Sequence, residues 1–382
     1  MIPLSLPNLD EKELESIKDV LCSGWLAHGE KNLEFERNFA NYLGVREAVS
    51  LNSCTSALFL ALKALNIQGE VILPSFTFVA TANAVVTAGA TPVFVDIDYH
   101  TCNMDPLKIE ASITSRTQAI IPVHYAGQSC QMDEILALAS HYRLAVIEDS
   151  AETLGGTFKG RKTGSFGIGC FSFFPTKNIT TGEGGMLTTD DPQLAAKVRA
   201  MAGHGIEETT LQREKKEKPW LRAATLAGYN FRMSNILAAL GVEQLKKLDS
   251  MNAARRKHAE YLNKHLNREF LDLPVEAKDC VHVYQMYTVK VKHLDRTRFV
   301  LKLREKGIGA SVHFDPPVHR QPFYANSGYG SKDLPVTEKV AASIVTLPLY
   351  PQLTQEQLDR MIIAIEETIR DLSRDTAALC PY

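Results

Sequence analysis

Short apolar runs alternate with segments of helical periodicity between residues 71 and 149. The apolar runs lie at residues 71–74, 92–95, 119–123 and 144–147. Between them the pattern predicts one helix between the first two runs and further helices near 106–113 and 132–142. Strands joined through helices form right-handed crossovers in a parallel sheet. The sequence therefore predicts an α/β protein with a mostly parallel central sheet.

Amphipathic segments dominate both ends of the chain. Asp10 precedes a periodic segment at 11–21, which predicts a capped helix. A long helical pattern covers 233–266, a strand pattern follows at 281–291, and further amphipathic helices are expected near 296–308 and 353–369. A chain of 382 residues exceeds one ordinary core. We predict a large domain over 1–245 and a smaller C-terminal α/β domain over 246–382.

Composition narrows the class of protein. A formal net charge of −2 gives no general attraction to nucleic acid or to an anionic membrane. The uncharged stretch 71–95 has the length of a membrane span, but Pro74, Gly89 and Pro92 interrupt it, so we interpret it as core. Seven scattered cysteines without CxxC spacing favour reduced thiols over disulfides or a metal site. Because a basic-then-apolar leader is also lacking, we expect a cytoplasmic protein without a metal.

The stretch FSFFPTKNITTGEGG, residues 171–185, contains a candidate nucleophile, Lys177. Desolvation by Phe173, Phe174 and Pro175 would disfavour the ammonium form of this lysine, which is the environment a Schiff-base lysine needs. The glycine-rich turn that follows would let backbone approach a ligand closely. Taken alone, however, a lysine beside glycines is typical of a solvated loop.

A second group changes that interpretation. The apolar run at 144–147 ends in Glu148 and Asp149, which is typical of a buried parallel strand that delivers a carboxylate to its C-terminal edge. Such a carboxylate could pair with a protonated pyridine nitrogen. A carrier lysine and a pyridinium partner are the two groups that pyridoxal 5′-phosphate (PLP) requires. The amides of Thr55 and Ser56, at the start of a predicted helix, are suited to its phosphate.

At this point a family resemblance becomes specific. LNSCTSALFLAL, PSFTFVATANAV, VIEDSAETLG, FSFFPTKNITTGEGGML and GYNFRMSNILAAL occur in this order. Together they resemble the DegT/DnrJ/EryC1/StrS family of PLP-dependent sugar aminotransferases. The likeness extends from SGWL near the N-terminus to LPLYPQLT near the C-terminus. It implies a fold-type I, aspartate-aminotransferase-like protein that acts as a homodimer.

The resemblance also implies roles for single residues. Lys177 would carry the cofactor, and Asp149 would hold its ring nitrogen. Phe78 would stack on the ring, and Ser172 would bind the phosphate. Asn230, in GYNFRM, would reach the cofactor phosphate of the partner subunit, so that the two subunits share their active sites.

Other positions depart from the family pattern or have an open role. Glu152 stands where relatives most often have His or Gln, and would act near the cofactor's phenolic oxygen or a substrate hydroxyl. Ala27 and His28 replace the usual Ser or Thr, and Cys54 replaces a glycine. His313 lies in a segment similar to the family's loop over the sugar, and is a candidate substrate ligand. The basic cluster at 213–218 could hold a nucleotide diphosphate, although a solvated loop is the simpler interpretation.

The function implied is transfer of an amino group from L-glutamate to a nucleotide-linked keto-sugar, either a 4-keto-6-deoxy or a 3-keto hexose. The product would be an amino sugar for a cell-surface glycan, such as the O-antigen of lipopolysaccharide, or for a secondary metabolite. Three alternatives remain open: a sugar dehydratase, which Lys177 argues against; an aminotransferase for a cyclitol or other non-nucleotide ketone; and a PLP-binding sensory protein, for which no DNA-binding module is evident.

Overall fold

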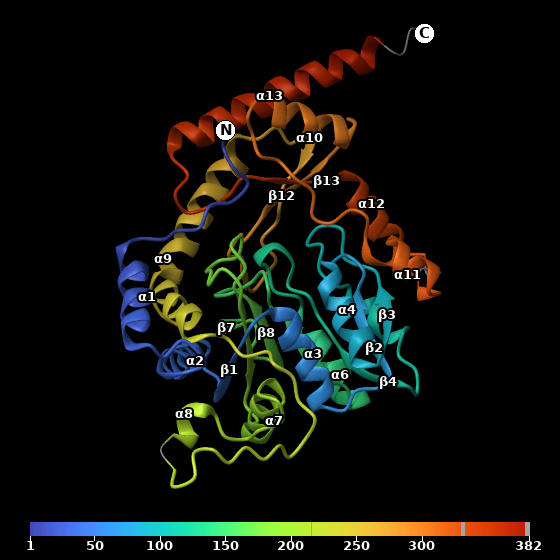
Figure 1. Ribbon diagram of the computed structural model, residues 1–382. Coiled ribbons are helices and arrows are strands. Elements are labelled where there is room, and N and C mark those ends of the chain that lie inside the picture. The colour runs from blue at the N-terminus through green and yellow to red at the C-terminus, as the bar shows by residue number, and fades with distance from the viewer. Residues whose placement is uncertain (215, 330–332, 379–382) are drawn as a thin grey trace.

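The computed structural model describes residues 1–214, 216–329 and 333–378, without the side chains of 375–378. A seven-stranded sheet of order β1-β9-β8-β5-β4-β2-β3 forms its centre (Figure 1). The strands are β1 (Glu47–Leu51), β2 (Glu70–Pro74), β3 (Thr91–Val95), β4 (Thr117–Ile120), β5 (Ala145–Asp149), β8 (Ile168–Ser172) and β9 (Gly185–Thr189). In this sheet β9 runs opposite in direction to the other six strands and pairs antiparallel with β1 and β8. The predicted α/β fold with a mostly parallel sheet is confirmed.

Helices in the connections cover this sheet: α3 (Cys54–Ala64), α4 (Val79–Ala88), α5 (Pro106–Glu110), α6 (Met132–Tyr142) and α7 (Pro192–Ala202). α3 has buried residues all around its axis and packs against α4, α7, β8 and β9. This burial reflects its composition, because eight of the eleven residues in CTSALFLALKA are hydrophobic. α3 is therefore a core helix that fixes the turn at its N-terminus.

Three helices form a layer beside the sheet (Figure 1). α1 (Glu11–Ser23) and α2 (Glu30–Leu43) both pack on α9 (Asn235–His265). The predicted cap of α1 is present, because Asp10 accepts a hydrogen bond from the amide of Lys12 while the Glu13 carboxylate accepts one from Asp10. Between α7 and α9 the chain is mostly irregular, with one short helix, α8 (Thr210–Arg213).

A second sheet of order β10-β12-β13 lies at the far end of α9 from α2 (Figure 1). It comprises β10 (Leu271–Asp272), β12 (Tyr287–Val291) and β13 (Ile344–Leu347), with α10 (Arg296–Glu305), α11 (Pro322–Asn326), α12 (Pro335–Ser343) and α13 (Gln355–Ala378) nearby. Ile2 is buried in this core and bridges to Ile308. The boundary predicted at 245 falls inside α9, and the division at that residue stays a prediction.

A small third sheet links the two parts of the chain, with β11 (Cys280–Val281) pairing to β6 (Thr157–Phe158), and β6 to β7 (Arg161–Lys162). No helix within the described ranges has the length and apolar character needed to cross a bilayer. The stretch 71–95 is strand, helix and strand in the core, as expected. The six cysteines in those ranges are free, whereas Cys380 lies outside them.

Candidate active site

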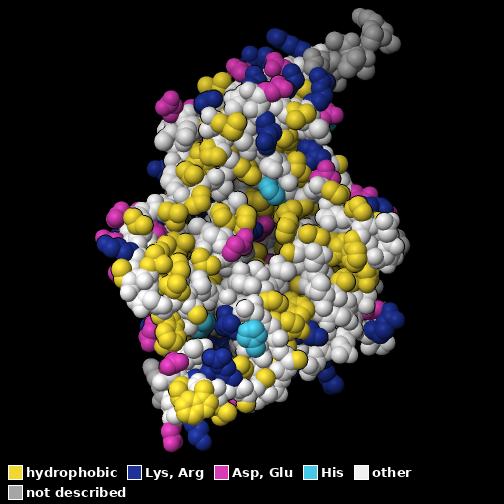
Figure 2. Space-filling view, viewed as in Figure 1, with side chains coloured by type: hydrophobic (Ala, Val, Ile, Leu, Met, Phe, Trp, Pro, Cys, Tyr) yellow, Lys and Arg dark blue, Asp and Glu magenta, His cyan; other side chains and the backbone are white. Residues whose placement is uncertain are grey.

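A cavity of about 380 Å³ opens where the ends of β2, β5 and β8 meet the N-termini of α3 and α4. A hollow is visible near the middle of the molecule in Figure 2. Seven of the predicted site residues line the cavity: Thr55, Phe78, Asp149, Glu152, Ser172, Lys177 and His313. Ser56 and Asn230 do not line it. Segments far apart in the sequence are thus brought together as the motifs predicted.

The two acidic residues at the end of β5 point in different directions, as successive strand residues do. Asp149 lines the cavity. Glu148 is fully buried on the other side, where it accepts hydrogen bonds from His124 Nε2 and from the amides of Gly164, Phe166 and Gly167. Glu148 therefore holds the loop before β8 in place, and Asp149 is the carboxylate available to a ligand.

Asp149 is 5% exposed and is surrounded by donors. Thr81 Oγ1 donates to its Oδ2 at 2.8 Å, and the Ala151 amide donates to Oδ1 at 3.2 Å. Burial raises the pKa of Asp149 above its ordinary value, while these hydrogen bonds oppose the rise. A positively charged group placed against this carboxylate would favour its ionised form.

The Lys177 amine faces a carboxylate. Its Nζ lies 3.4 Å from Glu152 Oε1, and Glu152 Oε2 accepts the amide of Ala126 at 2.8 Å. The desolvation expected from the neighbouring aromatic rings is only partly present. Phe173 packs against Phe35 in a hydrophobic cluster, with ring centroids 5.2 Å apart, and Phe174 is 46% exposed. The Lys177 amine is thus paired with Glu152, which sequence analysis had expected near the cofactor's phenolic oxygen or a substrate hydroxyl.

The turn before α3 lies in close contact with the backbone of β9. Ser53 caps the helix by accepting the amide of Ser56 at 3.1 Å, and Ser56 Oγ donates to Asn52, so Ser56 is already engaged. Gly185 abuts this turn. A Cβ at Gly185 would lie 2.3 Å from the carbonyl carbon of Ser53 and 2.5 Å from the amide nitrogen of Cys54. Gly185, the last glycine of GEGG, is therefore needed for β9 to pass the turn.

Aromatic and histidine side chains complete the wall. Phe78 is 59% exposed although it lies in a core motif, because its ring faces the cavity. Ser172 Oγ accepts the amide of Phe174 at 3.4 Å. His313 Nδ1 is 2.8 Å from Thr346 Oγ1, and burial lowers the pKa of His313 below its ordinary value. A neutral His313 at the cavity rim is suited to hydrogen bonding with hydroxyl groups.

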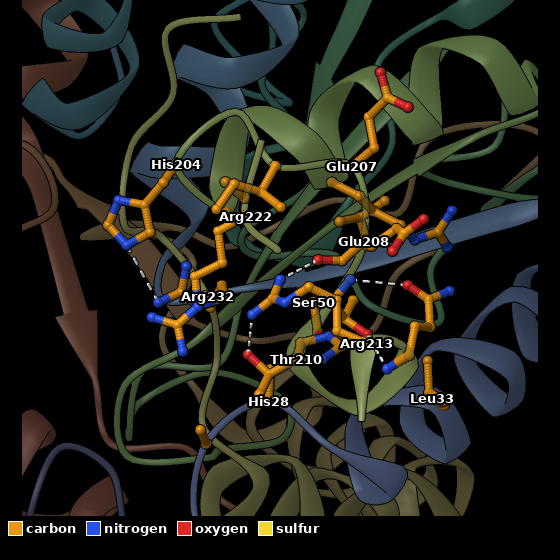
Figure 3. Close-up of a pocket in the computed structure, with 18 of the residues that line it drawn as sticks. His28, Leu33, Ser50, His204, Glu207, Glu208, Thr210, Arg213, Arg222 and Arg232 are labelled. Carbon is orange, nitrogen blue, oxygen red and sulfur yellow. Dashed lines mark hydrogen bonds between the residues drawn. The ribbon is translucent and has the colours of Figure 1, made fainter. Parts of the chain in front are cut away.

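A second, larger cavity of about 550 Å³ lies among α2, β1, α7 and the segment 203–232 (Figure 3). Arg199, Arg213, Arg222 and Arg232 line it, together with Glu36, Glu207 and Glu208. Lys and Arg side chains gather with histidines on this part of the surface (Figure 2). Asn230 lies just outside, with its backbone bridged to Gly203. The cavity is rich in arginine and is separate from the one that contains Lys177.

The structure corrects the interpretation of one basic residue here. Arg213 was expected in a solvated loop, but it is 8% exposed and its guanidinium donates to the Glu208 carbonyl and to Thr210 (Figure 3). Its Nε has no partner within the described part of the chain. Lys216 does pair on the surface with Glu208, and residue 215 lies outside the described residues. His28, the departure from the family pattern, also lines this cavity, 3.7 Å from Glu36.

The Lys177 cavity fits PLP by its donor set. It offers a primary amine, a carboxylate suited to a pyridinium, an exposed aromatic ring, and a helix N-terminus bordered by Ser53 and Thr55. No group of acidic, histidine or cysteine residues that could hold a metal occurs in the described ranges. Fold and site together define a fold-type I, PLP-dependent aminotransferase.

Comparison with known proteins identifies the family. The family model of the DegT/DnrJ/EryC1/StrS aminotransferases matches residues 7–366, and the chain belongs to this family. It is 41% identical to the spore coat polysaccharide biosynthesis protein SpsC of Bacillus subtilis, with 97% of each chain covered. It is 40% identical to GDP-perosamine synthase of Caulobacter vibrioides, covering 96% of this chain and 98% of that protein.

Solved structures agree with this assignment. The putative sugar aminotransferase Spr1654 of Streptococcus pneumoniae, in its PMP form, has a TM-score of 0.93 and 28% identity, over 97% of this chain and 100% of that one. The protein is an aminotransferase of a PLP-dependent family, as the motifs predicted.

Sequence analysis missed several cavity residues. Thr81, Thr176, Glu183, Gln285 and Phe314 line the Lys177 cavity. Thr81 had a usable signal, since it lies three residues after Phe78 and so one helical turn away. Phe314 follows His313 in the segment similar to the family's sugar loop, but only His313 was singled out there; Gln285 lies in the predicted strand pattern 281–291, which marks no site residue.

Proposed function

We propose that the protein transfers an amino group from L-glutamate to a nucleotide-linked keto-sugar, either a 4-keto-6-deoxy or a 3-keto hexose. The observation that carries this proposal is the meeting of Lys177 and Asp149 in one cavity at the ends of adjoining strands. The names of two relatives, GDP-perosamine synthase and a spore coat polysaccharide biosynthesis protein, support a nucleotide-linked sugar and a surface glycan.

In this proposal each cavity residue has a defined task. Lys177 binds PLP covalently, and Asp149 pairs with the ring nitrogen. Phe78 packs on the ring, and Thr55 and Ser172 hold the phosphate at the N-terminus of α3. The amide of Ser56 serves α3 through Ser53, so its contribution would be to shape the turn.

When bound, PLP would supply an electron sink that accepts the electron pair left behind when the substrate carbon loses its proton. The residues of the chain manage the protons. Lys177, with its amine free, would be the base that removes and returns the proton at the reacting carbon. Glu152, 3.4 Å away, keeps the Lys177 amine in position and can exchange a proton with it. His313 lines the cavity as a hydrogen-bonding group for a sugar hydroxyl, and the buried Thr346 holds its ring through Nδ1.

The arginine-rich cavity supports the nucleotide part of the proposal. The four arginines that line this cavity outnumber its three glutamates, which favours an anionic ligand such as a diphosphate. Asn230 lies beside this cavity and away from Lys177 of its own chain. Both observations fit a homodimer in which the segment 203–232 of one subunit completes the site of its partner.

The setting of the reaction is also part of the proposal. The product amino sugar would enter a cell-surface glycan such as an O-antigen, or a secondary metabolite. The free thiols in the described ranges support a cytoplasmic location. A cyclitol or other non-nucleotide ketone is the alternative acceptor, and a sensory role is the alternative without catalysis.

The first test is the absorbance spectrum of the PLP-loaded protein before and after addition of L-glutamate. We expect a visible band that is lost as the amino group is transferred, and then restored by a nucleotide-linked keto-sugar. Lys177→Ala should abolish turnover. Full activity in this variant would overturn the assignment of Lys177. Restoration by a cyclitol ketone alone would favour the alternative acceptor. A PLP band that L-glutamate leaves unchanged would favour the PLP-binding sensory protein.

A further inference from the structure

Asp149 receives three hydrogen bonds, and two of them come from side chains that the family motifs do not assign. Thr81 Oγ1 donates to Oδ2 at 2.8 Å. The Ala151 amide donates to Oδ1 at 3.2 Å, and the Cys54 thiol lies 3.9 Å from the same oxygen. Thr81 thus makes the short side-chain contact, on the carboxylate oxygen that the other two donors leave free.

The direction of the Thr81 proton follows from its neighbours. Thr81 Oγ1 lies 2.8 Å from Thr77 Oγ1 and 3.2 Å from the carbonyl of Phe78. A hydroxyl has one proton, and a carboxylate is the strongest of the available acceptors at the shortest distance. Thr77 therefore donates to Thr81, and Thr81 donates to Asp149. This chain of hydroxyls fixes which way the carboxylate faces.

Thr81 also connects two parts of the wall. It lies in the first turn of α4, is 1% exposed, and its amide donates to the carbonyl of Phe78. The ring that lines the cavity and the carboxylate at the end of β5 are therefore held by one residue. Removal of the Thr81 hydroxyl would take a hydrogen bond from the Asp149 carboxylate and leave Phe78 in place at the start of α4.

We propose that Thr81 is a positioning residue that holds Asp149 ionised and directed at the ring nitrogen of PLP. The inference rests on the proposed pairing of Asp149 with that nitrogen. Its physical basis is the burial of Asp149, which favours the neutral acid, together with Glu152 nearby, whose negative charge acts in the same direction. Hydrogen bonds to the charged form of Asp149 and the positive charge of Lys177 oppose both effects, and Thr81 supplies the shortest of these hydrogen bonds.

The test follows the ring nitrogen directly. Wild-type protein and Thr81→Val are loaded with PLP labelled with ¹⁵N in the ring, and the ¹⁵N chemical shift is followed with pH. Valine keeps the shape of threonine and removes the hydroxyl. We expect the wild-type ring nitrogen to stay protonated across neutral pH, and the Thr81→Val nitrogen to lose its proton at a pH lower by about one unit, with PLP bound about tenfold more weakly.

Two controls separate positioning from folding. Thr81→Ser keeps the hydroxyl and should restore the wild-type titration, whereas Thr87→Val makes the same change on the exposed side of α4 and should alter nothing. If Thr81→Val does not fold, Thr81→Ala is loaded instead and the same shift is expected. A wild-type titration in either folded variant would overturn the role of Thr81.

The proposed pairing itself is tested by Asp149→Asn. If that variant keeps the wild-type titration of the ring nitrogen, Asp149 is not the partner and the proposed function loses one of its assignments. If Asp149→Asn changes the titration and Thr81→Val does not, only the inference about Thr81 fails. The two failures are therefore distinguishable.

Discussion

Glu152 sets the charge around the reactive amine. Its carboxylate lies 3.4 Å from Lys177 Nζ, so Glu152→Gln would remove the counter-charge and keep the size of the side chain. We expect the apo variant to form its Schiff base with added PLP several-fold faster near neutral pH, because the amine is no longer held in an ion pair with a carboxylate. Stopped-flow absorbance measures this rate. Glu183→Gln, at a second acidic residue of the same cavity, is the control, and an unchanged rate in Glu152→Gln would contradict the prediction.

The residues that sequence analysis identified are those whose chemistry is local. Lys177 and Asp149 could be named because a Schiff-base lysine and a pyridinium partner are required by the cofactor and each lies in a recognisable motif. The contact between Glu152 and Lys177, by contrast, joins residues 25 positions apart through the fold. The donation from Thr81 to Asp149 joins residues 68 apart. Hydrophobic periodicity carries no information about such pairs.

The connection that leads into β12 contains a histidine whose burial should appear in the pH dependence of stability. His282 stacks on Tyr284, with ring centroids 3.8 Å apart, and its Nδ1 accepts the Tyr284 amide. Burial lowers the pKa of His282 from 6.5 to about 3, so the unfolded chain binds a proton that the folded chain does not over this range. The free energy of unfolding should therefore fall by roughly 1.4 kcal/mol per pH unit below about pH 6 from this group alone.

Urea unfolding of the apo protein between pH 4 and 6 measures this slope. In His282→Gln the free energy of unfolding should change less steeply with pH, by roughly 1.4 kcal/mol per pH unit, whatever the effect of the substitution on stability itself. His141→Gln, at an exposed position of α6, should leave the slope as in the wild type. Equal slopes in the wild type and His282→Gln would show that His282 does not titrate as its burial implies.

Elements with a strong pattern were predicted well, and short ones were not. α1 and β5 follow from a capping box and an apolar run, and both occur where expected. β6, β7 and β11 have two residues each, too few for a period to show. The pairing of β11 with β6 depends on segments more than 100 residues apart, which only the folded chain brings together.

At the scale of the whole molecule, the arrangement of the two cavities predicts that subunits share their sites. Lys177 lines one cavity, and Asn230 lies beside the other in the same chain. The test is to mix the Lys177→Ala and Asn230→Ala variants, each of which we expect to have low activity alone. In a mixed dimer, Lys177 of one subunit meets Asn230 of the other, and one site of the two is intact.

When the two variants are mixed in equal amounts and their subunits exchange at random, about a quarter of wild-type activity should return. Half of the dimers are then mixed, and each mixed dimer has one working site of two. Native mass spectrometry confirms that mixed dimers have formed. If they form and activity stays at the level of the single variants, Asn230 serves the site of its own chain and the arginine-rich cavity must have another ligand. Since Lys177 lines one cavity and Asn230 lies beside the other cavity of the same chain, recovered activity would require that a partner subunit brings them together.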